Sequence, residues 1–83
     1  MKYCIDFDDT LCVNGKPNMS LIMSMKAAQA RGSIVILFTS RTGKRLSEAV
    51  QFCRRHGLVF NQVIGGKPIA DCYIDDKAVN PFR

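Results

Sequence analysis

Residues 33–39, Ser-Ile-Val-Ile-Leu-Phe-Thr, contain the longest unbroken apolar run of the chain, from Ile34 to Phe38. A strand that is apolar at every position is typical of the middle of a parallel sheet, where both faces are covered. The run is far shorter than the roughly 18 to 20 residues that cross a bilayer, and Asp6 interrupts the N-terminus before a signal-peptide hydrophobic stretch develops. We therefore predict a buried central strand in a cytoplasmic protein without a membrane span.

Helical patterns stand on both sides of this strand. Before it, Asn18 can cap a helix to about Arg31, with Gly32 just past its end. After it, apolar residues recur at helical spacing over residues 43–56, and Gly57 ends the pattern. Strand patterns at 2–7, 58–64 and 70–74 complete an alternation of strands and helices. The 83 residues therefore predict one small α/β domain with a parallel sheet.

Polar residues stand at the carboxyl ends of three predicted strands: Asp6, Asp8 and Asp9 at the first, Thr39 at the second, and Asp75 and Asp76 at the fourth. Open α/β sheets bind ligands along this edge. Neighbouring carboxylates raise the free energy of ionising one another. The clustered acids therefore indicate a site that holds a cation or carries out a reaction.

A short flap is expected over the acids, because residues 11–18 contain Asn14-Gly15, a strong hairpin-turn signal. The net charge of +5 favours anionic partners, either phosphate-bearing metabolites or nucleic acid. The four cysteines form no CxxC pair, so we expect reduced thiols rather than a zinc site.

The segment Asp6-Phe7-Asp8-Asp9-Thr10 matches the motif DxDx[TV], and three further motifs follow in order at Thr39, Lys67 and Asp75-Asp76. In this combination the chain resembles the haloacid dehalogenase-like phosphohydrolase superfamily over nearly its whole length. The resemblance implies a small three-layer, Rossmann-like parallel sheet of about four strands in the order 4-1-2-3. No cap domain is expected, because neither insertion site has spare length. The strand and helix that usually follow the last motif are also expected to be absent.

The resemblance implies a phosphomonoesterase that depends on Mg²⁺. Asp6 would attack the phosphoryl group and form an aspartyl phosphate, and Asp8 would act as general acid and then as general base. Asp6, the backbone carbonyl of Asp8, and Asp75 or Asp76 would hold the metal. Thr39 would donate a hydrogen bond to a phosphate oxygen, and Lys67 would neutralise charge.

The candidate substrate-binding residues are Thr10, Ser40 and Arg41. Thr10 is expected to orient Asp8, whereas Arg41 either contacts a substrate phosphate or sugar or shields the helix entrance. Asp9 replaces the glycine that the resemblance leads one to expect, and the sequence assigns it no role.

Two other functional classes stay open: a receiver-like phospho-signalling domain, and a catalytically weak binding or regulatory subunit. As a substrate we expect a sugar phosphate, a nucleotide or a phosphorylated polymer end, with nucleic acid a partner only in that sense. In the order 4-1-2-3 both crossover helices fall on one face of the sheet. The other face would then be an exposed apolar patch, so we expect a homo-oligomer, with a dimer favoured.

Overall fold

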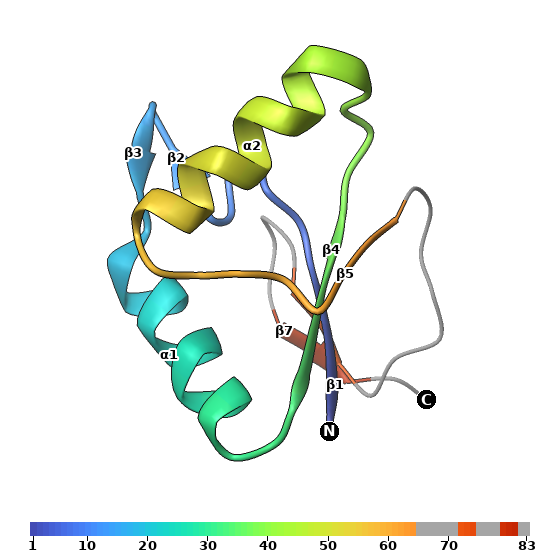
Figure 1. Cartoon of the computed structure of the whole chain (residues 1–83). Helices are drawn as coiled ribbons and strands as arrows, with labels where there is room; N and C mark the ends of the chain where they lie inside the picture. Colours follow the sequence, from blue (N-terminus) through green and yellow to red (C-terminus); the bar gives the residue numbers. More distant parts are fainter. Residues whose placement is uncertain (65–71, 75–78, 82–83) are drawn as a thin grey trace.

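The computed structural model describes residues 1–64, 72–74 and 79–81. Its elements, in chain order, are β1 (Lys2–Ile5), β2 (Cys12–Val13), β3 (Lys16–Pro17), α1 (Met19–Ala30), β4 (Ile34–Phe38), α2 (Gly43–Arg55), β5 (Gln62–Ile64), β6 (Cys72–Ile74) and β7 (Val79–Pro81) (Figure 1). Three candidate site residues, Lys67, Asp75 and Asp76, lie outside the described residues.

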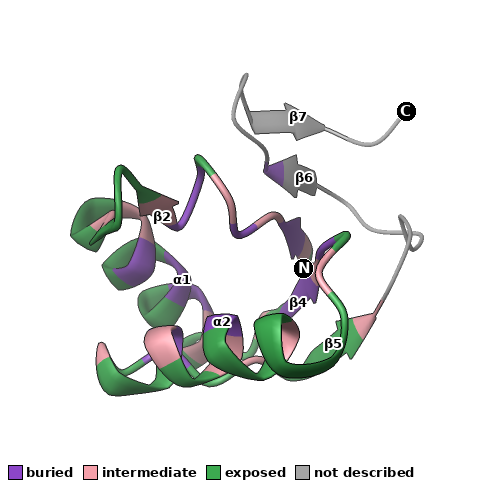
Figure 2. Cartoon of the chain, turned by 90° about the horizontal axis from the view of Figure 1, so that it is seen from above, coloured by how far each residue is buried: buried purple, intermediate pink, exposed green. Residues whose placement is uncertain are grey.

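The main sheet has five strands in the order β5-β4-β1-β6-β7. The first four are parallel to one another, and β7 is antiparallel to β6. Because β1, β4, β5 and β6 are the four predicted strands, the predicted α/β class and the order 4-1-2-3 are confirmed. Both helices lie on one face of the sheet (Figure 1 and Figure 2), so the described residues form two layers where the sequence predicted three.

The helices begin and end close to the predicted residues. Asn18 caps α1 by accepting a hydrogen bond at Oδ1 from Leu21 N, 3.3 Å away. Gly32 and Gly57 follow the two helices with φ of 91° and 90°, a left-handed conformation that favours glycine. Neither helix in the described part of the chain is long and apolar enough to cross a bilayer.

The core lies between the sheet and the two helices. Ile5 and Leu37 are paired neighbours on β1 and β4, and neither is exposed to solvent. Buried side chains from both helices belong to the same apolar cluster, which joins β1 and β4 to α1 and α2. Its helical members are Ile22, Met25, Ala49 and Cys53.

The third strand is shorter than predicted, because β5 begins at Gln62 rather than at residue 58. Before it, Asn61 N donates to the carbonyl of Val35 over 2.9 Å, and Val35 N donates to Asn61 Oδ1 over 2.8 Å. The Asn61 side chain therefore replaces the backbone partner that the edge of β4 would otherwise need. An apolar pattern alone does not reveal such a substitution.

The prediction that no strand follows the last motif is wrong. Val79 pairs with Ile74, and β7 extends the sheet beyond β6. A short strand that ends in proline has a weak sequence signal, because proline cannot donate a ladder hydrogen bond. Proline is nevertheless tolerated at a sheet edge, which is where Pro81 lies.

At the centre of the sheet face opposite the helices, the described side chains do not form the exposed apolar patch on which the predicted dimer was based. Successive strand residues point to opposite faces of the sheet. Ile5 and Leu37 face the helices, so their neighbours Cys4 and Ile36 point away from the helices. Within the single chain Cys4 is 0% and Ile36 is 3% exposed. The dimer therefore stays a prediction, and the centre of this face gives no support for it.

The burial of Cys53 should make its thiol inert. Burial raises the pKa of Cys53 to about 12, with a smaller contribution from Cys12, so at pH 8 the thiol stays protonated. We expect a maleimide reagent to label the partly exposed Cys12 in the native protein and to label Cys53 only after denaturation, as located by peptide mass spectrometry. Equal native labelling of the two residues would contradict the packing around α2.

The same shift has a consequence for stability. Between the ordinary thiol pKa of 9.0 and about 12, the folded protein holds a proton at Cys53 that the unfolded chain releases. The free energy of unfolding is therefore expected to fall as pH rises through this window, and Cys53 contributes no such loss below it.

Candidate active site

The carboxyl ends of β1, β4 and β6 meet at one edge of the sheet. Ile5 pairs with Leu37 on one side and with Ile74 on the other, and Asp6 N donates to the carbonyl of Ile74 over 2.9 Å. Asp6 directly follows β1, and Thr39 directly follows β4. Both residues therefore lie at the predicted edge.

A tight backbone turn holds the first acidic cluster. The carbonyl of Phe7 accepts hydrogen bonds from the backbone N–H groups of Thr10, Leu11 and Cys12 at 3.2, 3.0 and 3.0 Å. Phe7 and Leu11 are buried, which anchors the turn in the core, and Asp6 Oδ1 accepts from Phe7 N over 2.7 Å. The acids are therefore presented by a loop that its own apolar residues fix in place.

Asp9 is explained by the backbone of this turn. Its φ is 60°, a left-handed conformation that glycine adopts freely and that costs other residues about 1 kcal/mol. Aspartate and asparagine tolerate the conformation better than most residues, and Asp9 is exposed. Its N–H donates to the carbonyl of Cys12 over 2.9 Å, so Asp9 serves as a turn residue.

The predicted flap is a two-stranded hairpin formed by β2 and β3. Asn14 and Gly15 both have positive φ, 53° and 75°, as the predicted two-residue turn requires. A backbone bridge between Asp8 and Cys12 joins the hairpin to the acidic loop. The hairpin therefore continues directly from the loop that carries Asp8.

Asn18 ties the acidic loop to α1. Its Nδ2 donates to the carbonyl of Thr10 over 3.0 Å, and its N–H donates to the carbonyl of Leu11 over 2.8 Å. Together with its cap of α1, these bonds make Asn18 the residue that fixes the loop relative to the helix.

Two substitutions separate the roles of Asn18. Asn18→Ser keeps a good capping oxygen but loses the bond to Thr10, whereas Asn18→Ala loses both. In urea denaturation we expect Asn18→Ala to lower the free energy of unfolding by about 2 kcal/mol and Asn18→Ser by about half as much. If the two variants lost the same amount, the cap would contribute nothing.

Thr39 follows β4 directly and still has a hydroxyl proton to donate. It is 7% exposed, and its Oγ1 accepts a hydrogen bond from Arg41 N over 3.1 Å. A hydroxyl that accepts one bond still has its own proton to donate. Ser40, between these residues, is exposed, and Thr10 is buried with its Oγ1 3.5 Å from the carbonyl of Asp8. Thr10 therefore contacts the backbone of Asp8 and not its carboxylate.

Arg41 forms a bidentate ion pair with Asp8. Its Nη2 lies 2.6 Å from Asp8 Oδ1, and its Nε lies 2.9 Å from Asp8 Oδ2. The guanidinium also stacks on Phe7, 4.8 Å from the ring centroid. The hydrogen bond from Arg41, aided by its charge and that of Arg45, lowers the pKa of Asp8 against a smaller opposing effect of burial. No sequence signal predicted this pair.

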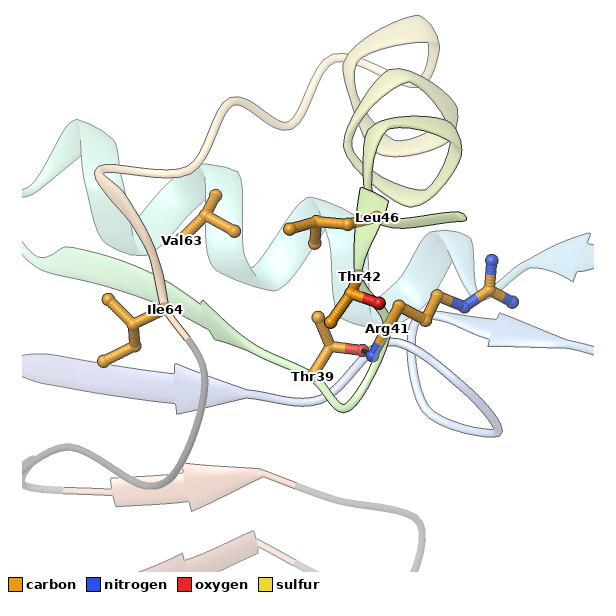
Figure 3. Close-up of a pocket in the computed structure, with 6 residues that line it drawn as sticks. All are labelled: Thr39, Arg41, Thr42, Leu46, Val63 and Ile64. Carbon is orange, nitrogen blue, oxygen red and sulfur yellow. Dashed lines mark hydrogen bonds between the residues drawn. The ribbon is translucent and has the colours of Figure 1, made fainter. Parts of the chain in front are cut away.

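A cavity of about 160 Å³ opens beside Thr39 (Figure 3). Its polar lining comes from the segment between β4 and α2, and its apolar lining comes from α2 and β5. The six lining residues are Thr39, Arg41, Thr42, Leu46, Val63 and Ile64. It is smaller than the roughly 300 Å³ of a typical ligand pocket, so it fits a small chemical group.

The described residues include only some of the ligands that the sequence predicts for Mg²⁺. Among them, no three His, Cys, Asp or Glu side chains come together as possible ligands. The Asp6 carboxylate and the Asp8 carbonyl are hard oxygen donors of the kind that Mg²⁺ prefers. The other predicted ligand, Asp75 or Asp76, lies beyond the described end of β6.

No protein-family model and no curated protein matches the chain. Among solved structures it is similar to a conserved protein coded by a locus from Bacteroides thetaiotaomicron. The two share 28% sequence identity with a TM-score of 0.84, over 100% of this chain and 81% of the other. The name of that protein states no activity, so the likeness supports the fold and leaves the chemistry to be argued from the site.

Proposed function

We propose that the chain is a Mg²⁺-dependent phosphomonoesterase of the haloacid dehalogenase-like superfamily, acting through an aspartyl phosphate on Asp6. The observation that carries the proposal is the meeting of Asp6, on a turn anchored by Phe7, with Thr39 at the carboxyl edge of adjacent parallel strands. Such an edge is where open α/β sheets bind ligands. The order of the four motifs along the sequence supports the same assignment: Asp6 and Asp8 come first, followed by Thr39, Lys67 and Asp75-Asp76.

The reaction divides into two steps. First, a carboxylate oxygen of Asp6 attacks phosphorus, the bond to the leaving oxygen breaks, and protonated Asp8 gives that oxygen its proton. Then Asp8 takes a proton from water as the water oxygen attacks phosphorus, which breaks the bond to Asp6 and releases phosphate. Asp8 regains the proton that it gave, so the cycle closes.

The other motif residues would bind the phosphoryl group. Thr39 would donate its hydroxyl proton to a phosphate oxygen, and Lys67 would offset negative charge there. Asp6, the carbonyl of Asp8, and Asp75 or Asp76 would hold Mg²⁺, which reduces the repulsion between carboxylate and phosphate. We also propose that the protein is cytoplasmic and forms a dimer. Light scattering tests the dimer, because a monomer mass in solution would contradict it.

A phosphate-release screen tests this function. Sugar phosphates, nucleotides and 3′-phosphorylated oligonucleotides are incubated with the protein in Mg²⁺ and, in parallel, in excess EDTA. We expect release from at least one class in Mg²⁺ and none in EDTA. No release from any class would contradict the enzyme and favour a binding or regulatory subunit, and phosphorylation retained by the protein would favour a receiver-like domain.

A further inference from the structure

The ion pair between Arg41 and Asp8 occupies a carboxylate that the proposed reaction needs. Both oxygens of Asp8 accept hydrogen bonds from the guanidinium, at 2.6 and 2.9 Å. While these bonds persist, one lone pair of each oxygen is engaged and the guanidinium charge holds the carboxylate ionised, so Asp8 carries no proton for a leaving group. The pair must open before Asp8 can act.

Arg41 is the fixed member of the pair. Its side chain is 18% exposed, against 47% for that of Asp8. It rests on the buried ring of Phe7, its Nη1 donates to the carbonyl of Arg45 over 3.4 Å, and its backbone N–H donates to Thr39. Because Asp8 is the more exposed partner and Arg41 has these additional contacts, we expect the pair to open by movement of the Asp8 side chain.

A phosphate group can take the place of the Asp8 carboxylate. Guanidinium binds carboxylates and phosphates with the same two-pronged geometry, so Arg41 needs no rearrangement to accept either. Thr39 belongs to the same short turn, and its hydroxyl still has a proton to donate while its oxygen accepts from Arg41 N. One short segment after β4 therefore carries two groups that can donate hydrogen bonds to a phosphate.

We propose that Arg41 is a built-in phosphate-binding residue that Asp8 occupies in the resting protein, and that the phosphate of the substrate displaces Asp8, whose released carboxylate then takes a proton from water and can give it to the leaving oxygen. The inference rests on the proposed function for the role of Asp8, and its binding step does not require turnover. In this proposal the phosphate group of the substrate itself breaks the ion pair. An uncharged analogue of the substrate would therefore leave Asp8 paired with Arg41.

Phosphate binding without metal tests the exchange. Inorganic phosphate is titrated by calorimetry, in the presence of EDTA, into the wild-type protein and three variants. Asp8→Asn removes the competing charge, and we expect it to tighten the Kd for phosphate about 5-fold to 10-fold. Asp9→Asn removes the same charge one residue away, without a contact to Arg41, and should tighten it at most about 2-fold. Arg41→Gln should weaken it at least about 10-fold.

Two results would overturn the inference. Equal tightening by Asp8→Asn and Asp9→Asn would show that only the net charge matters, and unchanged affinity in Arg41→Gln would show that phosphate binds elsewhere. If the Arg41→Gln variant does not fold, Arg41→Lys replaces it. Lysine keeps the charge but cannot donate the two parallel hydrogen bonds of a guanidinium, so weakened phosphate binding is again expected. The binding experiment requires no turnover. It can therefore disprove the exchange at Arg41 without disproving the phosphatase, and the phosphate-release screen can disprove the phosphatase without disproving the exchange.

Discussion

Asp6→Asn is expected to abolish phosphate release, lowering kcat by about 10⁴-fold or more. An amide does not attack phosphorus, so the first step has no nucleophile. The substitution nearly preserves the shape of the side chain, and Asn can still accept the 2.7 Å hydrogen bond that Phe7 N donates to Asp6 Oδ1. We therefore expect an unchanged melting temperature alongside the lost turnover, measured on the best substrate of the phosphate-release screen.

Asp9→Asn is the matched control for this loss. It makes the same chemical change three residues later in the same loop, and asparagine tolerates the left-handed φ of 60° as well as aspartate does. Because Asp9 is exposed and serves the turn, its variant should keep activity within about 3-fold of wild type. Turnover that survived Asp6→Asn, or that disappeared equally in both variants, would exclude Asp6 as the nucleophile.

Leu37→Ala is expected to have the largest effect on stability. Leu37 lies on β4, is 0% exposed, and belongs to the cluster that joins the sheet to both helices. Removing its side chain leaves a cavity and should lower the free energy of unfolding by about 3 kcal/mol. That is a large share of the roughly 5 to 15 kcal/mol that stabilises a small domain, so urea denaturation should detect it easily.

Ile34→Ala on the same strand is the control. Ile34 is 38% exposed, so its truncation removes less buried surface and should cost less than about 1 kcal/mol. Equal losses from the two substitutions would mean that β4 is not buried as described. A small loss from Leu37→Ala alone would contradict the position of the core between the sheet and the helices.

Local patterns predicted most of the fold because each had a physical cause within a few residues. The cap at Asn18 and the glycines at 32 and 57 determined the ends of the helices. The continuous apolar run at 34–38 placed β4 in the middle of the sheet. The errors arose where a distant partner decided the outcome: the Asn61 side chain replaces a strand partner of Val35, and β7 forms by pairing with β6.

In the candidate site, too, the sequence predicted the features that follow from local pattern and topology and missed the contacts between distant residues. Topology predicted that Asp6 and Thr39 would lie at one edge, because strand order fixes where strand ends meet. The pair between Asp8 and Arg41 joins residues 33 positions apart on two different loops, so it exists only once the chain has folded. The left-handed backbone of Asp9 likewise explains a residue to which the motif assigned no role.

Phosphorylation of Asp6 during turnover is the central claim, and trapping the intermediate tests it most directly. The wild-type protein is quenched while it hydrolyses its best substrate and is then treated with borohydride, which reduces an acyl phosphate to an alcohol. Peptide mass spectrometry locates the product. We expect homoserine in place of aspartate at position 6. Homoserine at position 75 or 76, or unmodified protein at every carboxylate while phosphate is being released, would contradict the proposed mechanism.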